Sequence, residues 1–443
     1  MTRLQHRSIN LTAKKNHFDI HDRQNFEHIL QGKYINQNRI LANSSDGSDH
    51  TIRIEELLGK GGYGEVYRVC YINQPTQHFA LKIPRDPLEI TRNYINNEIQ
   101  KLNTLQRSGS KYIPKILPFF FFWGEERIPC YLTHIYKPIC DVFPSFSQNE
   151  PMDPINALKL FYLITLGLKH ITSHHIVHND IKPENIMFYG ETPIITDYGT
   201  ARSNSEIDEV EIERISGRLH GTPIWLPPEL ISIHEDEYGR PYVYYNLSKV
   251  CQKTDVWGLG LILMRCLTGR NLFSMSSITT FSTPDIFFKI KYLFNENNIL
   301  GKYKSWCQRY INRLYKNNDP LQKQNLDIEQ IRYLLGSNST EQDDPPLTTK
   351  RKHKKEMFSS GRFMAAKLLM RKIELMSRNR SDVEIRDFFI ETLFELHDIC
   401  TAPLVERVKV YRLVNTLVQV FPGLREIDRQ LHVPDLTTCA LYE

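Results

Sequence analysis

The segment His178–Asn185, which reads HNDIKPEN, constrains this chain more than any other stretch of its sequence. Asp197-Tyr198-Gly199 follows it and adds a second carboxylate ahead of a glycine. Phosphoryl transfer needs its attacking and leaving oxygens held in line and the phosphate charge neutralised. We therefore expect Asp180 to accept the proton of an attacking hydroxyl and Lys182 to balance charge on the migrating group. Asn185 and Asp197 offer the hard oxygen ligands that suit Mg²⁺.

A glycine-rich stretch, Gly59-Lys60-Gly61-Gly62-Tyr63-Gly64, precedes this segment in the chain. Glycines at positions 59, 61 and 64 let the backbone approach phosphate oxygens and donate N–H groups to them. The same spacing also opens dinucleotide-binding folds, so alone it is weak evidence. Here the residues that follow, Glu65–Val69, read as a strand and not as the start of a helix. That favours a phosphate-binding β-hairpin over a Rossmann turn.

The next apolar run, Phe79–Ile83, carries one lysine, Lys82, and reads as a strand. A lone lysine on a strand is most often a surface residue, but its position behind the glycine loop favours a phosphate contact. Tyr94–Leu105 has helical spacing of its apolar residues. Within it Glu98 is the expected partner of Lys82, and Glu89 is the second choice because Pro87 stands beside it.

Six motifs in this order resemble those of the eukaryotic-type protein kinases, and together they cover Ile54–Leu267. The HND loop is similar to the family's HRDxKxxN and DYG is similar to DFG. Gly221–Glu229 is similar to the GTxxYxAPE ending of the activation segment, and Asp255–Gly260 is similar to DxWSxG. Departures from the family pattern include Asn179 for Arg, Tyr198 for Phe and Pro227 for Ala.

The resemblance implies an α+β, bilobal fold with a small β-rich N-lobe and a larger helical C-lobe that carries an extended C-terminal helical insertion. It implies ATP and Mg²⁺ as cofactors and a protein substrate with a Ser/Thr acceptor. The catalytic residues would be Asp180, Lys182, Lys82 and Thr222, with Asn185 and Asp197 on the metal. The nucleotide would be bound by Gly59, Lys60, Gly61, Gly62, Tyr63, Gly64, Val66, Ala80, Lys82, Glu98 and Met187.

The same resemblance implies several supporting contacts. Ile135–Pro138 would form the hinge beside the adenine, with His134 next to it as a packed structural residue. Leu102, His178 and Tyr198 would stack as an apolar column. Asp255 would hold the backbone of the catalytic loop, and Arg407 is a candidate partner for Glu229.

We expect five regions along the chain. Residues 1–45 form a polar extension, in which Phe26, Ile29 and Leu30 have helical spacing. Residues 46–136 form the N-lobe, and residues 137–273 form the core of the C-lobe. Residues 274–375 form a helical insertion, and 376–443 supply helices that close the C-lobe. The expected helices in the last two regions are 287–293, 303–315, 328–335, 363–376, 387–397 and 404–420. The basic run Lys350–Lys355 is either an exposed loop or an address for the nucleus or an acidic partner.

Two departures from the family pattern carry expectations of their own. In the family the arginine at position 179 grips a phosphorylated residue of the activation segment, so Asn179 predicts activity that does not require such phosphorylation. The hydroxyl of Tyr198 is expected to add a hydrogen bond that phenylalanine lacks. Lys182 and the Gly221-Thr222 pair are typical of the serine/threonine type.

Composition excludes several other classes of protein. A net charge of +5 over 443 residues is mild and does not indicate a nucleic-acid partner. The most apolar windows, Pro118–Trp123 and Val256–Leu267, are too short to cross a bilayer. Eight scattered cysteines without a CxxC pair, and an N-terminus without an apolar core, predict a cytoplasmic protein with reduced thiols. The content of Asn, Ile, Lys and Tyr indicates an AT-rich genome. A eukaryotic-type kinase with a divergent C-terminal half resembles effectors from intracellular bacteria or kinases of large viruses.

Two other functions remain open at this stage. The chain could be a pseudokinase-like scaffold that binds nucleotide and partner proteins, although the expected lysine, base and metal carboxylate are all present. It could also share the core but act on a small-molecule acceptor. The GT…PPE ending favours a protein acceptor.

Overall fold

The computed structural model describes residues 34–36, 39–41, 52–86, 88–123, 126–203, 225–235, 241–245, 249–271, 298–315, 326–336, 360–377, 380–434 and 436. The chain divides into two compact units, residues 1–95 with 118–132, and residues 96–117 with 133–443. The first is rich in strands and the second is mainly helical, which confirms the expected α+β class.

The first unit is built on a seven-stranded sheet with the order β2-β1-β3-β4-β5-β7-β6. Its central antiparallel strands are β3 (Ile52–Lys60), β4 (Gly64–Tyr71) and β5 (Gln74–Pro84). Strand β4 is covered on both faces, because all its residues are buried except Val66 and Arg68, which are half-buried. The remaining strands are β1 (Tyr34–Asn36), β2 (Arg39–Leu41), β6 (Ile116–Trp123) and β7 (Glu126–Thr133).

Helix α2 (Glu89–Gln106) is longer than the sequence pattern indicates. It begins five residues before Tyr94, so Glu89 lies in its first turn and the expected later start is wrong. Asp86 explains the early start because its Oδ1 accepts hydrogen bonds from the Leu88 N–H at 3.2 Å and the Thr91 hydroxyl at 2.7 Å. The Leu88 N–H lies just before the helix and Thr91 donates its hydroxyl from the first turn, so Asp86 fixes the chain at the entry to α2.

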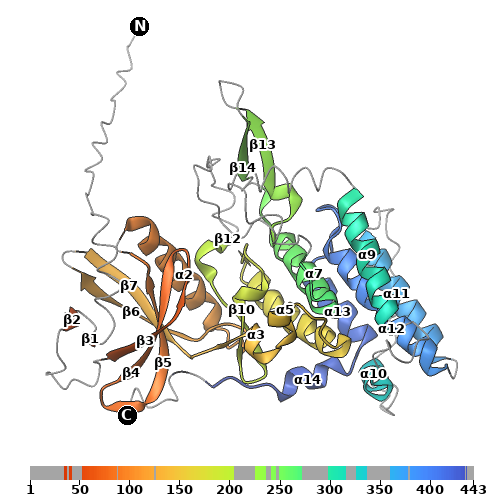
Figure 1. Cartoon of the computed structure of the whole chain (residues 1–443), viewed down its shortest axis with the longest axis horizontal. Helices are drawn as coiled ribbons and strands as arrows, with labels where there is room; N and C mark the ends of the chain where they lie inside the picture. Colours follow the sequence, from red (N-terminus) through yellow and green to blue (C-terminus); the bar gives the residue numbers. More distant parts are fainter. Residues whose placement is uncertain are drawn as a thin grey trace, which may run out of the picture. The chain divides into compact units, whose positions relative to one another are not determined.

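The second unit has two long central helices, α5 (Pro154–Ser173) and α7 (Gln252–Thr268), which pack against each other (Figure 1). Asp153 caps α5 by accepting the N–H groups of Ile155 and Asn156, both at 3.0 Å. Every residue of α7 from Thr254 to Thr268 is buried. Most of these residues are apolar, as is typical of a helix that is covered on all sides.

The C-terminal helices complete this core. Helix α12 (Asp382–Cys400) packs on α7, and α13 (Val410–Val420) packs on α5. Gly260 of α7 allows a close approach, because a Cβ there would lie 2.7 Å from the Cβ of Cys400. The other helices in this part are α9 (Asn298–Tyr315), α10 (Ile328–Leu335), α11 (Ser360–Met376) and α14 (Leu424–Gln430).

The second unit also contains several short elements. They are α3 (Ile139–Val142), α4 (Ser145–Gln148), β8 (Lys137–Pro138), β9 (Ile176–Val177), β10 (Ile186–Tyr189), β11 (Thr192–Ile195) and β12 (Arg202–Ser203). β13 (Ile231–Glu235) and β14 (Pro241–Tyr245) form an antiparallel hairpin that the sequence pattern did not predict.

The expected helices at 303–315, 328–335, 363–376 and 387–397 all lie within described helices. The expectation for 404–420 is partly wrong because α13 starts at Val410. Residues 401–409 instead turn, and their carbonyls at Leu404 and Val405 accept hydrogen bonds from Lys253 at 2.8 and 3.0 Å. The helices expected near Phe26 and at 287–293, and the basic run Lys350–Lys355, lie outside the described residues.

Candidate functional site

The glycine loop joins β3 to β4 in the first unit. The Gly61 N–H donates to the Gly64 carbonyl at 2.8 Å and closes the turn. A Cβ added at Gly59 or Gly62 would meet nothing within 4 Å, so both backbones border open space. Gly64 is tight, because its Cβ would lie 3.0 Å from the Ile83 carbonyl oxygen and 3.2 Å from Cε of Lys82. A side chain at position 64 would therefore displace the lysine.

Four predicted nucleotide contacts share one face of this sheet. Val66 pairs with Lys82 and Arg68 pairs with Ala80 across β4 and β5. Because side chains two residues apart point to the same face, Gly64, Val66, Ala80 and Lys82 lie on one side. Next to this face, the Tyr63 ring stacks on Tyr94 of α2 with centroids 4.3 Å apart. The Nζ of Lys60 lies 3.6 Å from Glu65 Oε1.

The catalytic loop of the second unit is held by a buried carboxylate. Asp255, at the start of α7, accepts the backbone N–H groups of His178 and Asn179, both at 2.8 Å. This confirms the expected contact. Burial raises the pKa of Asp255 to about 7, and the two N–H donors act in the opposite direction. Asn179 has a left-handed backbone with φ of 66°, a conformation that asparagine tolerates better than most residues.

Two side chains of this loop contact the carboxylate of Asp180. Lys182 Nζ lies 2.6 Å from Asp180 Oδ2, and Asn185 Nδ2 donates to the same oxygen at 3.1 Å and to the Asp180 carbonyl at 2.8 Å. Asp180 and Asn185 are both buried, at 6% and 5% exposure. The structure thus brings the predicted base, lysine and amide together.

His178 joins this loop to the DYG segment. Its Nε2–H donates to the Thr196 carbonyl at 2.9 Å, and its Nδ1 accepts the Asp180 N–H at 3.3 Å. These bonds use a neutral imidazole, and burial lowers the pKa of His178 accordingly. Its ring meets Tyr198 edge-on at 4.7 Å. Leu102, the third member of the expected column, is also fully buried.

The two predicted metal ligands lie on neighbouring segments. The Thr196 N–H donates to the Asn185 carbonyl at 2.9 Å, which places Asp197 beside the end of the catalytic loop. Because Asn185 uses Nδ2 as a donor, its amide oxygen is the atom that could coordinate an ion. One carboxylate and one amide oxygen fit Mg²⁺, which usually completes its shell with water and substrate phosphates. The described residues contain no cluster of three His, Cys, Asp or Glu side chains that would hold a metal unaided.

Helix α2 also contacts the DYG segment within the second unit. Glu98 Oε1 accepts the Tyr198 N–H at 3.0 Å, and Asn97 Nδ2 donates to the carbonyls of Gly199 and Ala201 at 2.9 and 3.0 Å. Asn97 was not among the predicted residues, and its one signal in the sequence is its place beside Glu98. Lys82 belongs to the first unit, so its pairing with Glu98 stays a prediction.

Tyr198 does not use its hydroxyl as expected. The side chain is fully buried, and its oxygen has no hydrogen-bond partner among the described residues. The expected additional hydrogen bond is therefore wrong. The ring packs on His178 instead, and the desolvated hydroxyl has a pKa far above its usual value.

The hinge expected at Ile135–Pro138 is connected to Met187. Pro138 of β8 pairs with Met187 of β10, whose side chain is half-buried. His134 is 6% exposed and its Nε2 lies 3.0 Å from the Pro434 carbonyl oxygen, which agrees with a packed structural role.

Arg407 and Glu229 form the ion pair that the sequence indicated. Nη1 and Nη2 of Arg407 lie 2.6 and 3.1 Å from the two carboxylate oxygens. Thr222 lies outside the described residues.

The described cysteines form no disulfide with one another. Among the described helices, none has the length and apolar character needed to cross a bilayer.

Comparison with known proteins places these observations in a family. The model of the protein kinase domain matches residues 52–322, which is more than half of the chain. An Aurora kinase of Debaryomyces hansenii is 25% identical over 256 residues, 55% of this chain and 55% of that protein. A probable serine/threonine-protein kinase of Dictyostelium discoideum is 25% identical over 255 residues, 56% of this chain and 49% of that protein. A serine/threonine-protein kinase of Chlamydia felis is 27% identical over 245 residues, 48% of this chain and 24% of that protein. The chain thus spans about half or less of the length of these relatives.

Proposed function

Because the chain belongs to the protein kinase family, we propose that it transfers the γ-phosphoryl group of ATP to serine or threonine hydroxyls of protein substrates. The observation that carries the proposal is the contact of Lys182 and Asn185 with one buried oxygen of Asp180. A carboxylate fixed in this way is oriented before the substrate arrives, and preorganised groups are the main source of catalysis in this reaction.

In the proposed reaction the acceptor oxygen attacks the γ-phosphorus, and a new O–P bond forms as the bond to the β,γ-bridging oxygen breaks. ADP keeps the electron pair of that bond, and the hydroxyl proton passes to the Asp180 carboxylate. Lys182 stabilises negative charge on the migrating group. Asp255 holds the loop backbone, so it positions Asp180 without touching the substrate.

The nucleotide would be bound by backbone N–H groups of the glycine loop and by Lys82, with Val66, Ala80 and Met187 against the adenine. Asn185 and Asp197 would hold Mg²⁺, which neutralises phosphate charge when bound. Protein kinases generally use both ATP and this ion. Thr222 would orient the base from the activation segment.

The test is incorporation of radiolabelled phosphate from ATP into a generic basic protein, followed by analysis of the labelled amino acids. We expect phosphoserine or phosphothreonine with the wild type and at least a 100-fold lower kcat for Asp180→Asn, since general-base catalysis contributes about 10²–10⁴-fold. Glu191→Gln is the matched control, because it makes the same chemical change at an exposed position in the turn after β10.

Equal labelling by wild type and Asp180→Asn would contradict the role of the base. Absence of labelling by folded wild type, with nucleotide binding retained, would favour the scaffold function. Label on a small molecule but never on protein would favour the small-acceptor function.

A further inference from the structure

The segment Leu424–Pro434, which consists of α14 and residues 431–434, contacts a part of the second unit that lies far away in the sequence. We call it the C-terminal segment. It packs on α5 and is bonded to the chain after α2. The matched kinase domain ends at residue 322, so similarity to the family assigns no role to this segment.

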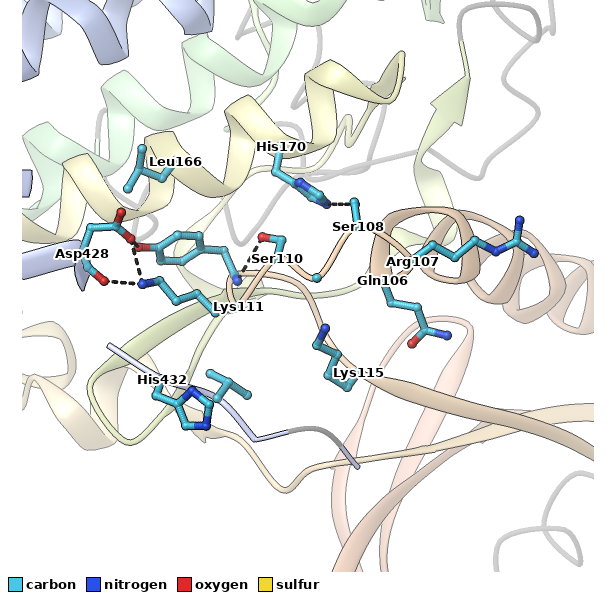
Figure 2. A pocket seen from close by; sticks show the side chains of 13 residues that line it. Gln106, Arg107, Ser108, Ser110, Lys111, Lys115, Leu166, His170, Asp428 and His432 are labelled. Atoms are coloured by element: carbon cyan, nitrogen blue, oxygen red, sulfur yellow. Dashed lines mark hydrogen bonds and ion pairs between the residues drawn. The ribbon is translucent and has the colours of Figure 1, made fainter. Parts of the chain in front are cut away.

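Asp428 attaches the C-terminal segment through two neighbouring side chains. It accepts the hydroxyl of Tyr112, and its Oδ1 lies 2.9 Å from Nζ of Lys111, which also donates to the Leu431 carbonyl at 3.2 Å. Figure 2 shows Lys111 and Asp428 facing each other beside a pocket that both segments line. Burial and the Asp428 carboxylate raise the pKa of the Tyr112 hydroxyl far above its usual value, so this hydroxyl stays a donor.

Tyr112 also contacts β11, the strand that leads to the DYG segment. Its carbonyl accepts the Ile195 N–H at 3.0 Å. Both residues lie against Gly167 of α5, where an added Cβ would be 3.1 Å from the Tyr112 Cβ and 2.7 Å from Cδ1 of Ile195. Tyr112 is 5% exposed and Ile195 is fully buried. Such close packing ties the position of β11 to that of Tyr112.

Asp197, the proposed Mg²⁺ ligand, comes two residues after Ile195. Its backbone is left-handed, with φ of 67°, a conformation that residues other than glycine keep only where the surroundings hold them in it. Two bonds fix the chain immediately before it, from the Ile195 N–H to Tyr112 and from the Thr196 N–H to Asn185. Only the first of these bonds links Asp197 to the C-terminal segment.

From these contacts we infer that Asp428 and Tyr112 are positioning residues for Mg²⁺, which hold the strand before Asp197 without contacting the ion or the nucleotide. The inference rests on the proposed function, because it takes Asp197 as a ligand of the ion that accompanies the nucleotide. Groups that orient a metal ligand affect metal affinity when they are replaced. Loss of the Tyr112 hydroxyl or of the Asp428 carboxylate is therefore expected to weaken the contribution of Mg²⁺ and to spare nucleotide binding without the ion.

The experiment measures the Kd of ADP for the full chain by titration calorimetry, once in EDTA and once with Mg²⁺. The Kd in EDTA divided by the Kd with Mg²⁺ reports what the ion contributes. For Tyr112→Phe and for Asp428→Ala we expect this ratio to fall about threefold or more, which is less than the roughly 10–100-fold loss typical of groups that contact a metal ligand directly. The Kd in EDTA is expected to change less than about twofold.

Two further variants make the test specific. Tyr112→Phe combined with Asp428→Ala is expected to lose no more than the larger single loss, because both changes remove the same hydrogen bond. Glu426→Ala is the matched control, since it truncates another acidic residue of α14 whose carboxylate pairs with the exposed Arg429 at 3.3 Å. It is expected to keep the wild-type ratio.

Hydrogen exchange provides a second measurement that needs no nucleotide. The Ile195 amide is expected to exchange faster in Tyr112→Phe than in wild type, because its acceptor is the Tyr112 carbonyl. Reduced stability alone does not produce the expected ratio, since partial unfolding weakens ADP binding equally in EDTA and in Mg²⁺.

Unchanged ratios in Tyr112→Phe and Asp428→Ala, or changes equal to that of Glu426→Ala, would overturn the inference and leave the proposed function intact. Absence of any effect of Mg²⁺ on ADP binding by the folded wild type would overturn both.

Discussion

The ion pair between Arg407 and Glu229 allows a quantitative test of how the second unit is held together. The Arg407 side chain is fully buried and that of Glu229 is 12% exposed. The guanidinium also donates to the carbonyls of Ala402 and Lys253, at 3.1 and 3.0 Å, and lies 5.0 Å from the ring centroid of Trp257. One side chain therefore satisfies a carboxylate and two backbone carbonyls.

Arg407→Met keeps much of the apolar volume but removes the charge and all of these donors. Removal of one partner from a buried pair costs about 3–5 kcal/mol, because the other charge stays buried and uncompensated. We therefore expect the free energy of unfolding to fall by about 4 kcal/mol. Replacement of both partners, in Arg407→Met with Glu229→Met, removes the uncompensated charge, so its cost is expected to be smaller than the sum of the single changes.

The assay is urea unfolding followed by tryptophan fluorescence, since Trp257 lies against the guanidinium. Arg429→Met is the control: its partner is Glu426 at 3.3 Å, and the arginine side chain is 72% exposed. An exposed pair of this kind contributes less than about 1 kcal/mol. A loss below about 1 kcal/mol for Arg407→Met, equal to that of the control, would refute the reasoning.

Four further predictions concern the catalytic loop and its supports. Tyr198→Phe is expected to leave stability unchanged or raise it by about 1 kcal/mol, because it removes a buried hydroxyl without a described partner; a lower midpoint of thermal unfolding would contradict this. The pKa of Asp255 is raised from 3.8 to about 7 on folding, so its contribution to stability is complete below pH 3.8 and is lost as the pH rises through about 7. The stability of wild type relative to Asp255→Asn, measured by urea unfolding, is therefore expected to fall between pH 5 and pH 8, and a constant difference would be inconsistent with it. Gly258→Ala places a Cβ 2.4 Å from the carbonyl oxygen of Ile181, the residue after Asp180. It is expected to lower the free energy of unfolding by about 1–3 kcal/mol and to lower kcat. Gly62→Ala is the control, because its Cβ would meet nothing within 4 Å, and it is expected to leave the unfolding midpoint unchanged. Because Asn179 replaces the phosphate-gripping arginine, phosphatase treatment is expected to leave activity intact; the opposite result, reproduced by combined alanine substitution of Ser203, Ser205 and Ser216, would disprove it.

The sequence predicted the catalytic loop well because its chemistry is local in the chain. Asp180, Lys182 and Asn185 lie within six residues, and the structure brings them to one oxygen. By contrast, Asn97 acquires its role only when α2 packs beside the DYG segment. A carboxamide on a helix carries no signal of such a contact, so periodicity alone could not find it.

Helix boundaries show the same limit. Pro87 suggested a late start for α2, but the carboxylate of Asp86 accepts the Leu88 N–H and the Thr91 hydroxyl and so fixes an earlier start. Apolar spacing extended the last long helix back to residue 404, although residues 401–409 turn to bring Arg407 to Glu229. Both errors arise where side-chain contacts override the pattern of apolar residues.

The packing of α12 and α13 on the central helices has a practical consequence. Similarity to the family ends at residue 322, yet α7 and α5 are covered by segments that come after residue 380. A polypeptide that ended at residue 322 would expose the faces of α5 and α7 that α13 and α12 cover. It would also lack Arg407, the ion-pair partner of Glu229. We therefore expect that a stable expressed fragment, or a segment exchanged with a relative, has to extend beyond residue 430, well past the end of the matched kinase domain.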